Sequence, residues 1–122
     1  MTTFALSTTL QIIVACGLIN VWLVRSRSAT AYRGGSAQSL SDEFETYGLP
    51  AWSFSVVGFL TVGSALLLIA GIWFPALIRP PAVIVAGLMV GALMMHAKVK
   101  DPWTKFVPAF LMLVMSTAIA LL

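Results

Sequence analysis

The sequence predicts an all-α integral membrane protein, a four-helix bundle with a short amphipathic helix in its first loop. Of the 122 residues, 60% are hydrophobic and 9% are charged, whereas a soluble domain carries about a quarter charged residues. A chain of this length has too much surface for its volume to bury so many apolar side chains in its own core. Long uncharged stretches also recur along the chain, and the hydrocarbon of a bilayer suits them.

Four membrane-spanning helices account for nearly the whole chain. A spanning helix needs roughly 17 to 25 mostly apolar residues, and spanning strands would alternate apolar and polar residues, which these stretches do not. A cleaved signal peptide is disfavoured, because the first stretch lacks preceding basic residues and its apolar run is too long. We predict one transmembrane domain, 1–122, with spans of about 4–24, 51–74, 82–97 and 102–122 and a polar cap at 25–50.

Prolines and charged residues mark the ends of the spans. Pro50 precedes the second span, where a missing N–H does no harm. The segment FPALIRPP, residues 74–81, predicts a stiff turn between the second and third spans. Lys98 lies at the end of the third span, where a cation suits the helix dipole. Asp101 is expected to cap the fourth helix, and Pro108 is expected to bend it.

The polar cap contains SLSDEFETYGLP, residues 39–50, which predicts a helix of about two turns. Ser39 or Ser41 can cap it, and Asp42 and Glu43 fall in the first turn, where negative charge is favourable. Gly48 can end it in a left-handed conformation. One apolar face is formed by Leu40, Phe44 and Tyr47. We expect this amphipathic helix to lie at the membrane surface or against the bundle.

The sequence RGG, residues 33–35, precedes this helix and has two interpretations. Exposed amides of Gly34 and Gly35 beside Arg33 can hold an anion such as a phosphate or a carboxylate. Alternatively, the glycines only turn the chain, and the arginine forms an ion pair within the cap. Its candidate partners are Asp42, Glu43 and Glu45.

The basic residues divide unevenly between the two sides of the membrane. Six follow the first and third spans, namely Arg25, Arg27, Arg33, Lys98, Lys100 and Lys105, and only Arg79 follows the second. Cytoplasmic loops carry the excess of basic residues. The loops 25–50 and 98–105 are therefore predicted to be cytoplasmic, with both termini outside. The net charge of +3 marks this topology and does not indicate a nucleic-acid partner.

Three short segments, AYRGG, DEFETYGLP and HAKVKDP, resemble the DoxX-like family of small bacterial membrane proteins. The resemblance covers most of the chain in architecture and implies a place in the bacterial inner membrane and an association with quinone-linked redox chemistry. Where this chain has Leu40 and Asp42, a methionine and a glutamate would be more usual in the family.

His96, the only histidine, lies near the cytoplasmic end of the third span. Ionisable groups at membrane depth suggest function, and an imidazole can bind a quinone carbonyl or exchange a proton. The alternative is an interfacial histidine bonded to the polar loop. One histidine and one cysteine, Cys16, argue against a metal or haem centre.

Other residues are expected to pack helices together. Asn20 is expected to be buried and to join two helices or to orient His96. Gly87 and Gly91 form a G-x-x-x-G pair, for which packing within the bundle is favoured over dimerisation.

Two functions remain open. The first is an accessory protein of a membrane redox system that binds a quinone or lipid as its only suggested cofactor. The second is a structural or assembly subunit that contacts other membrane proteins or further copies of itself in the bilayer. No nucleophile with a matching base is visible, so independent catalysis is disfavoured. The candidate ligand-binding residues are Arg33, Gly34, Gly35, Asp42, Glu43, Tyr47, His96 and Lys98.

Overall fold

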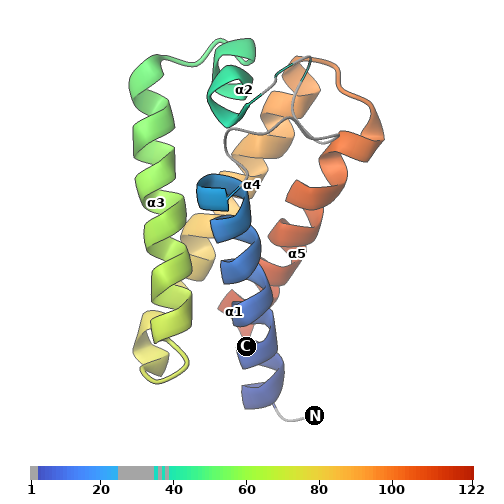
Figure 1. The fold of residues 1–122 in the computed structure, drawn as a ribbon. Coiled ribbons are helices and arrows are strands. Elements are labelled where there is room, and N and C mark those ends of the chain that lie inside the picture. The colour runs from blue at the N-terminus through green and yellow to red at the C-terminus, as the bar shows by residue number, and fades with distance from the viewer. Residues whose placement is uncertain (1–2, 25–34, 36, 38) are drawn as a thin grey trace.

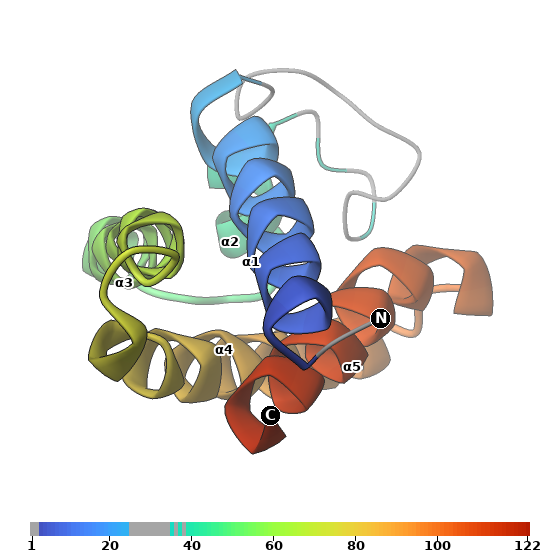
Figure 2. The same ribbon diagram turned by 90° about the horizontal axis from the view of Figure 1, so that it is seen from below.

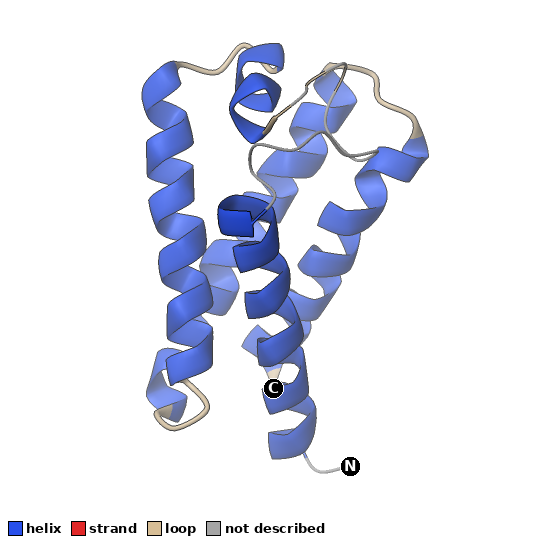
Figure 3. Ribbon diagram, viewed as in Figure 1, coloured by secondary structure: helices blue, strands red, loops and turns tan. Residues whose placement is uncertain are grey.

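The computed structural model describes residues 3–24, 35, 37 and 39–122, and this part of the chain contains helices and no strand (Figures 1 and 3). The elements in chain order are α1 (Thr3–Ile19), the π-helix η1 (Asn20–Val24), α2 (Leu40–Thr46), α3 (Ala51–Ala70), the 3₁₀-helix η2 (Pro75–Leu77), α4 (Arg79–Lys98), the 3₁₀-helix η3 (Trp103–Phe106) and α5 (Val107–Leu121).

Four of these segments are long and apolar enough to cross a membrane: Thr3–Val24, Ala51–Ala70, Pro75–Lys98 and Trp103–Leu121. Their outer surfaces carry large hydrophobic side chains, with Phe59 79% and Phe4 66% exposed. Such surfaces are unfavourable in water and favourable against lipid. The predicted all-α, multi-pass membrane protein is therefore confirmed.

Prolines place the helix ends differently from the prediction. The second span ends at Ala70, and the third helical segment already begins at Pro75. Pro80 lies in the first turn of α4, and Pro108 lies in the first turn of α5. The first N–H groups of a helix lack an intrahelical partner, so proline is tolerated there. The predicted fourth span is therefore divided into the 3₁₀-helix η3 and α5, and Pro108 lies at the start of α5 and not inside a longer α-helix.

The four long helices pack around a shared core. Helix α1 contacts α3 and α5, and α4 contacts the same two helices. Figure 2 shows α3 and α5 on either side of α1. The start of α1 and the C-terminus lie towards the end where α3 connects to α4, whereas α2 lies at the opposite end (Figure 1). The core residues are Val14, Ala15, Leu18, Ala65, Leu68, Ala82, Val85 and Ile119.

Small residues let parts of the chain approach closely in the second span, but not at the predicted G-x-x-x-G pair of the third. A Cβ atom on Gly58 of α3 would lie 2.8 Å from the Trp22 ring, so this glycine makes room for the indole. A Cβ atom on Gly87 or Gly91 would meet no atom within 4 Å, so within the described chain neither glycine lies against another helix. Asn20 is exposed in η1, and the expectation that it is buried is wrong.

Helix α2 forms as its sequence predicts. The Ser39 hydroxyl oxygen accepts a hydrogen bond from the Asp42 N–H at 3.1 Å, which satisfies one free donor of the first turn. Gly48 adopts a φ of +77°, the left-handed conformation that ends helices. Leu40 and Tyr47 are buried on the inner face. Glu43 is buried too, and its carboxylate accepts a hydrogen bond from the Tyr47 hydroxyl.

Candidate functional site

A buried pair of ionisable side chains lies where α4 ends. His96 belongs to the last turn of α4, and Asp101 follows in the connection to η3. The Nδ1 atom of His96 lies 2.6 Å from Oδ2 of Asp101, and the two side chains are only 6% and 4% exposed. Asp101 therefore does not cap the fourth helix as predicted. A buried imidazole provides a stronger partner for its carboxylate.

The second carboxylate oxygen of Asp101 holds the first loop. The N–H of Gly35 donates to Oδ1 at 2.9 Å, and Lys105 Nζ lies 3.8 Å from the same oxygen. Burial raises the pKa of the Asp101 carboxyl group, but the hydrogen bonds from His96 and Gly35 and the charge of Lys105 outweigh burial. The pKa therefore lies below its usual value of 3.8, and the group is a carboxylate at neutral pH.

The charge of Asp101 fixes the tautomer of a neutral His96. An ionised carboxylate only accepts hydrogen bonds, so Nδ1 must carry the proton and Nε2 the lone pair. Within the described residues, the hydrogen bonds of His96 involve Nδ1 alone. No described buried side-chain nitrogen or oxygen lacks a partner. Nε2 is therefore not fully enclosed, and it keeps a small accessible surface.

Aromatic rings surround the imidazole. The Tyr47 ring from the end of α2 meets His96 edge to face at 5.9 Å between centroids, and the Phe106 ring from η3 lies 5.5 Å away. The Tyr47 hydroxyl donates to Glu43 Oε1 at 2.6 Å. The imidazole thus lies between an aromatic ring of the cap and an aromatic ring of the fourth span.

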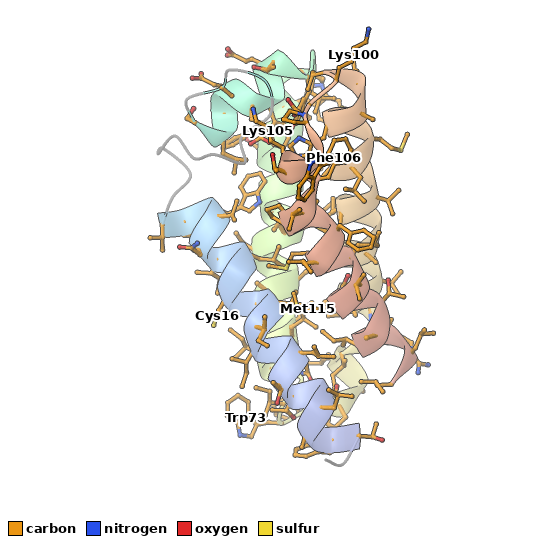
Figure 4. All side chains as sticks on the ribbon, turned by 90° about the vertical axis from the view of Figure 1, so that its right-hand side faces the viewer. Cys16, Trp73, Lys100, Lys105, Phe106 and Met115 are labelled. Carbon is orange, nitrogen blue, oxygen red and sulfur yellow. The ribbon has the colours of Figure 1, made fainter. Side chains whose placement is uncertain are left out.

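Two lysines tie the flanks of α2 to the connection between α4 and α5. Lys98 Nζ donates to the Tyr47 carbonyl oxygen at 2.7 Å, and Lys105 Nζ donates to the Gly35 carbonyl oxygen at 2.7 Å. Figure 4 shows Lys105 and Phe106 at the end of the molecule that carries α2. Because both flanks of α2 are bonded in this way, the cap is held over the end of α4.

An apolar groove of about 370 Å³ lies beside this pair on the α4–α5 surface. Its lining residues are Leu93, Trp103, Phe106, Val107, Phe110 and Leu111. Phe106 lines the groove and also contacts the His96 ring. A slightly larger groove of about 410 Å³ lies between η1, α2 and α3. Neither His96 nor Asp101 lines either groove, and the smaller one is linked to the pair through the Phe106 ring.

The structure brings together five of the predicted ligand-binding residues, namely Gly35, Glu43, Tyr47, His96 and Lys98. Asp42 is exposed on the outer side of α2, and among the described residues no hydrogen bond or ion pair links its side chain to His96 or Asp101, so the structure does not place it in the site. Arg33 and Gly34 lie outside the described residues, so both interpretations of the RGG segment stay predictions there. The amide of Gly35 does hold a carboxylate, but it is the internal carboxylate of Asp101.

Sequence reasoning missed Asp101, Lys105 and Phe106 as site residues. The available signal was the segment HAKVKDP, in which a histidine precedes an acidic residue by five positions at the end of a span. Among the described residues, no group of three or more His, Cys, Asp or Glu side chains is placed to hold a metal ion. The arrangement is suited to hydrogen bonding and proton exchange.

The DoxX-like family model matches residues 13–119. This range includes α3 and α4 in full, most of α5, about the second half of the span Thr3–Val24 and the His96–Asp101 pair. Neither the curated proteins nor the solved structures gave a match.

Proposed function

The chain belongs to the DoxX-like family, and from this membership we propose that it is an accessory protein of a membrane redox system that binds a quinone-type ligand at His96. The bacterial inner membrane, with the α2 end towards the cytoplasm, is the proposed location. The lipid bilayer would both surround the protein and deliver the ligand.

The observation that carries this proposal is the buried His96–Asp101 pair. Taking a carboxylate out of water is unfavourable unless hydrogen bonds and charges compensate, and Asp101 has three such partners in His96, Gly35 and Lys105. This arrangement holds one imidazole in a defined orientation while its second nitrogen stays accessible. Simple anchoring of the loop would not require a titratable ring at this place.

The adjoining groove supports a ring-shaped, membrane-soluble occupant. Its lining offers aromatic faces from Trp103, Phe106 and Phe110 and carries no charged side chain. Aromatic rings favour stacked or edge-on partners, and an apolar tail would continue along Leu111 into the lipid. The polar oxygen of the ligand would then lie towards His96, since Phe106 is shared by the groove and the imidazole.

Ligand retention tests this proposal. Protein purified in mild detergent is extracted with organic solvent, and the quinone per protein is measured by mass spectrometry. We expect extractable quinone from the wild type, and a loss of about tenfold in His96→Ala, which corresponds to about 1.4 kcal/mol of binding free energy. Met94→Ala is the matched control, because Met94 lies on the same helix and is exposed. Wild-type protein without quinone would favour a structural or assembly subunit.

A further inference from the structure

Asp101 has no freedom to act as a donor in the site. The Gly35 N–H donates to Oδ1 at 2.9 Å, and the positive charge of Lys105 lies 3.8 Å from the same oxygen. Oδ2 is occupied by the imidazole at 2.6 Å. The hydrogen bonds and the nearby cation both favour the ionised form of this carboxylate.

The consequence appears at the opposite nitrogen of the imidazole. In neutral imidazole one nitrogen is a donor and the other an acceptor. Since Nδ1 donates to Asp101, Nε2 of neutral His96 offers a lone pair. A hydroxyl group on a ligand can donate to this lone pair, whereas a carbonyl or ether oxygen brings a second lone pair and no proton.

We propose that the His96 site, with its imidazole neutral, selects ligands that present a hydroxyl group, such as a phenol or a hydroquinone, over ligands that present a carbonyl or ether oxygen at the same position. The inference rests on the proposed function and narrows it to the reduced form of a quinone-type ligand. The inference depends on the hydrogen bonds that Asp101 forms with Gly35 and His96 and on the nearby charge of Lys105.

One substitution should reverse the selection without removing the ring. In Asp101→Asn, the Gly35 N–H still needs an acceptor, so the amide oxygen takes the position of Oδ1. The amide NH₂ group then takes the position of Oδ2 and faces His96. Nδ1 must then accept, and the ring proton moves to Nε2. The variant therefore presents a donor where the wild type presents an acceptor, and it should prefer the carbonyl or ether ligand.

The test uses three probes with the full chain in lipid nanodiscs, and empty nanodiscs serve as the partition control. Para-nonylphenol and its methyl ether differ in the replacement of the hydroxyl proton by a methyl group, and neither undergoes a redox change in the assay. Decyl-benzoquinone probes the proposed function itself. Binding constants are measured by isothermal titration for the wild type, Asp101→Asn and Asp42→Asn. Asp42→Asn is the matched control, since Asp42 is exposed on α2.

We expect the wild type and Asp42→Asn to bind the phenol about five- to tenfold more tightly than the ether, the size of effect expected from one net hydrogen bond. Asp101→Asn should lose or invert this ratio.

Equal binding of phenol and ether by the wild type, with the quinone still bound, overturns the selection and leaves the proposed function standing. Absence of binding by all three probes overturns both. A hydroxyl preference that persists in Asp101→Asn, with thermal unfolding showing a folded protein, overturns the role of Asp101.

Discussion

At the scale of single residues, Asp101 joins parts of the chain that the sequence keeps far apart. It bonds His96 of α4 and the backbone of Gly35 in the first loop, 66 positions away. Removing its charge should weaken both links, so Asp101→Asn is expected to lower the stability at neutral pH by about 1–3 kcal/mol. The midpoint of thermal unfolding in detergent measures this loss.

The same carboxylate predicts a pH dependence with a defined sign. Its pKa is held below 3.8 in the folded protein, so its contribution is present above the pKa of the unfolded chain and is lost as the pH falls through the folded value. The difference in unfolding midpoint between wild type and Asp101→Asn should shrink towards about pH 3. Asp42→Asn should show only a small difference throughout. A constant difference between wild type and Asp101→Asn down to that pH would contradict an ionised Asp101.

At the scale of helices, some glycines leave space that a neighbouring side chain occupies, and others have no neighbour in that space. The Trp22 ring packs with Phe44 and Phe54 at 5.9 and 5.2 Å between centroids, and Gly58 leaves the space for it. Gly58→Ala should therefore destabilise the protein by about 1–3 kcal/mol through overpacking. Gly87→Ala should be neutral or slightly stabilising, because alanine favours helix and nothing lies nearby.

Thermal unfolding of both glycine variants, at several protein concentrations, distinguishes these cases. A stable Gly58→Ala protein would mean that the indole lies elsewhere. Destabilisation by Gly87→Ala that depends on protein concentration would instead show that a second chain packs on α4 through the G-x-x-x-G face.

Elements with local signals could be predicted from the sequence. Helix α2 follows from a capping serine, an apolar face and a terminal glycine, all within residues 39–48. The four spans follow from length and composition, because lipid imposes both. The starts of α4 and α5 differ from the predicted ones, because both helices have a proline in the first turn, at Pro80 and Pro108. The local sequence does not distinguish a proline in a first turn from a proline at a bend.

The candidate site could be predicted only in part, because its bonds join distant segments. Local reasoning made Asp101 a helix cap, the common role of an aspartate before a proline. Its actual partners depend on how the first loop folds back over α4, which no local pattern encodes. His96 was found because a single ionisable ring in an apolar helix is unusual. The expected packing at Gly87 and Gly91 is wrong, because spacing alone does not say which neighbour a helix face meets.

At the scale of the whole molecule, the arrangement of the ends predicts a labelling pattern. Helix α2 and Lys105 lie at one end, and Trp73 lies at the other (Figures 1 and 4). With the basic loops cytoplasmic, a cysteine at Ser41 or Thr104 in a Cys16→Ser background should react with a membrane-impermeant maleimide only after the cells are permeabilised. Trp73→Cys, at a side chain that is 70% exposed, should react in intact cells.

The opposite pattern would invert the orientation while keeping four crossings. Reaction of Ser41→Cys and Trp73→Cys from the same side would contradict the crossings themselves, since an odd number of spans must separate these two positions.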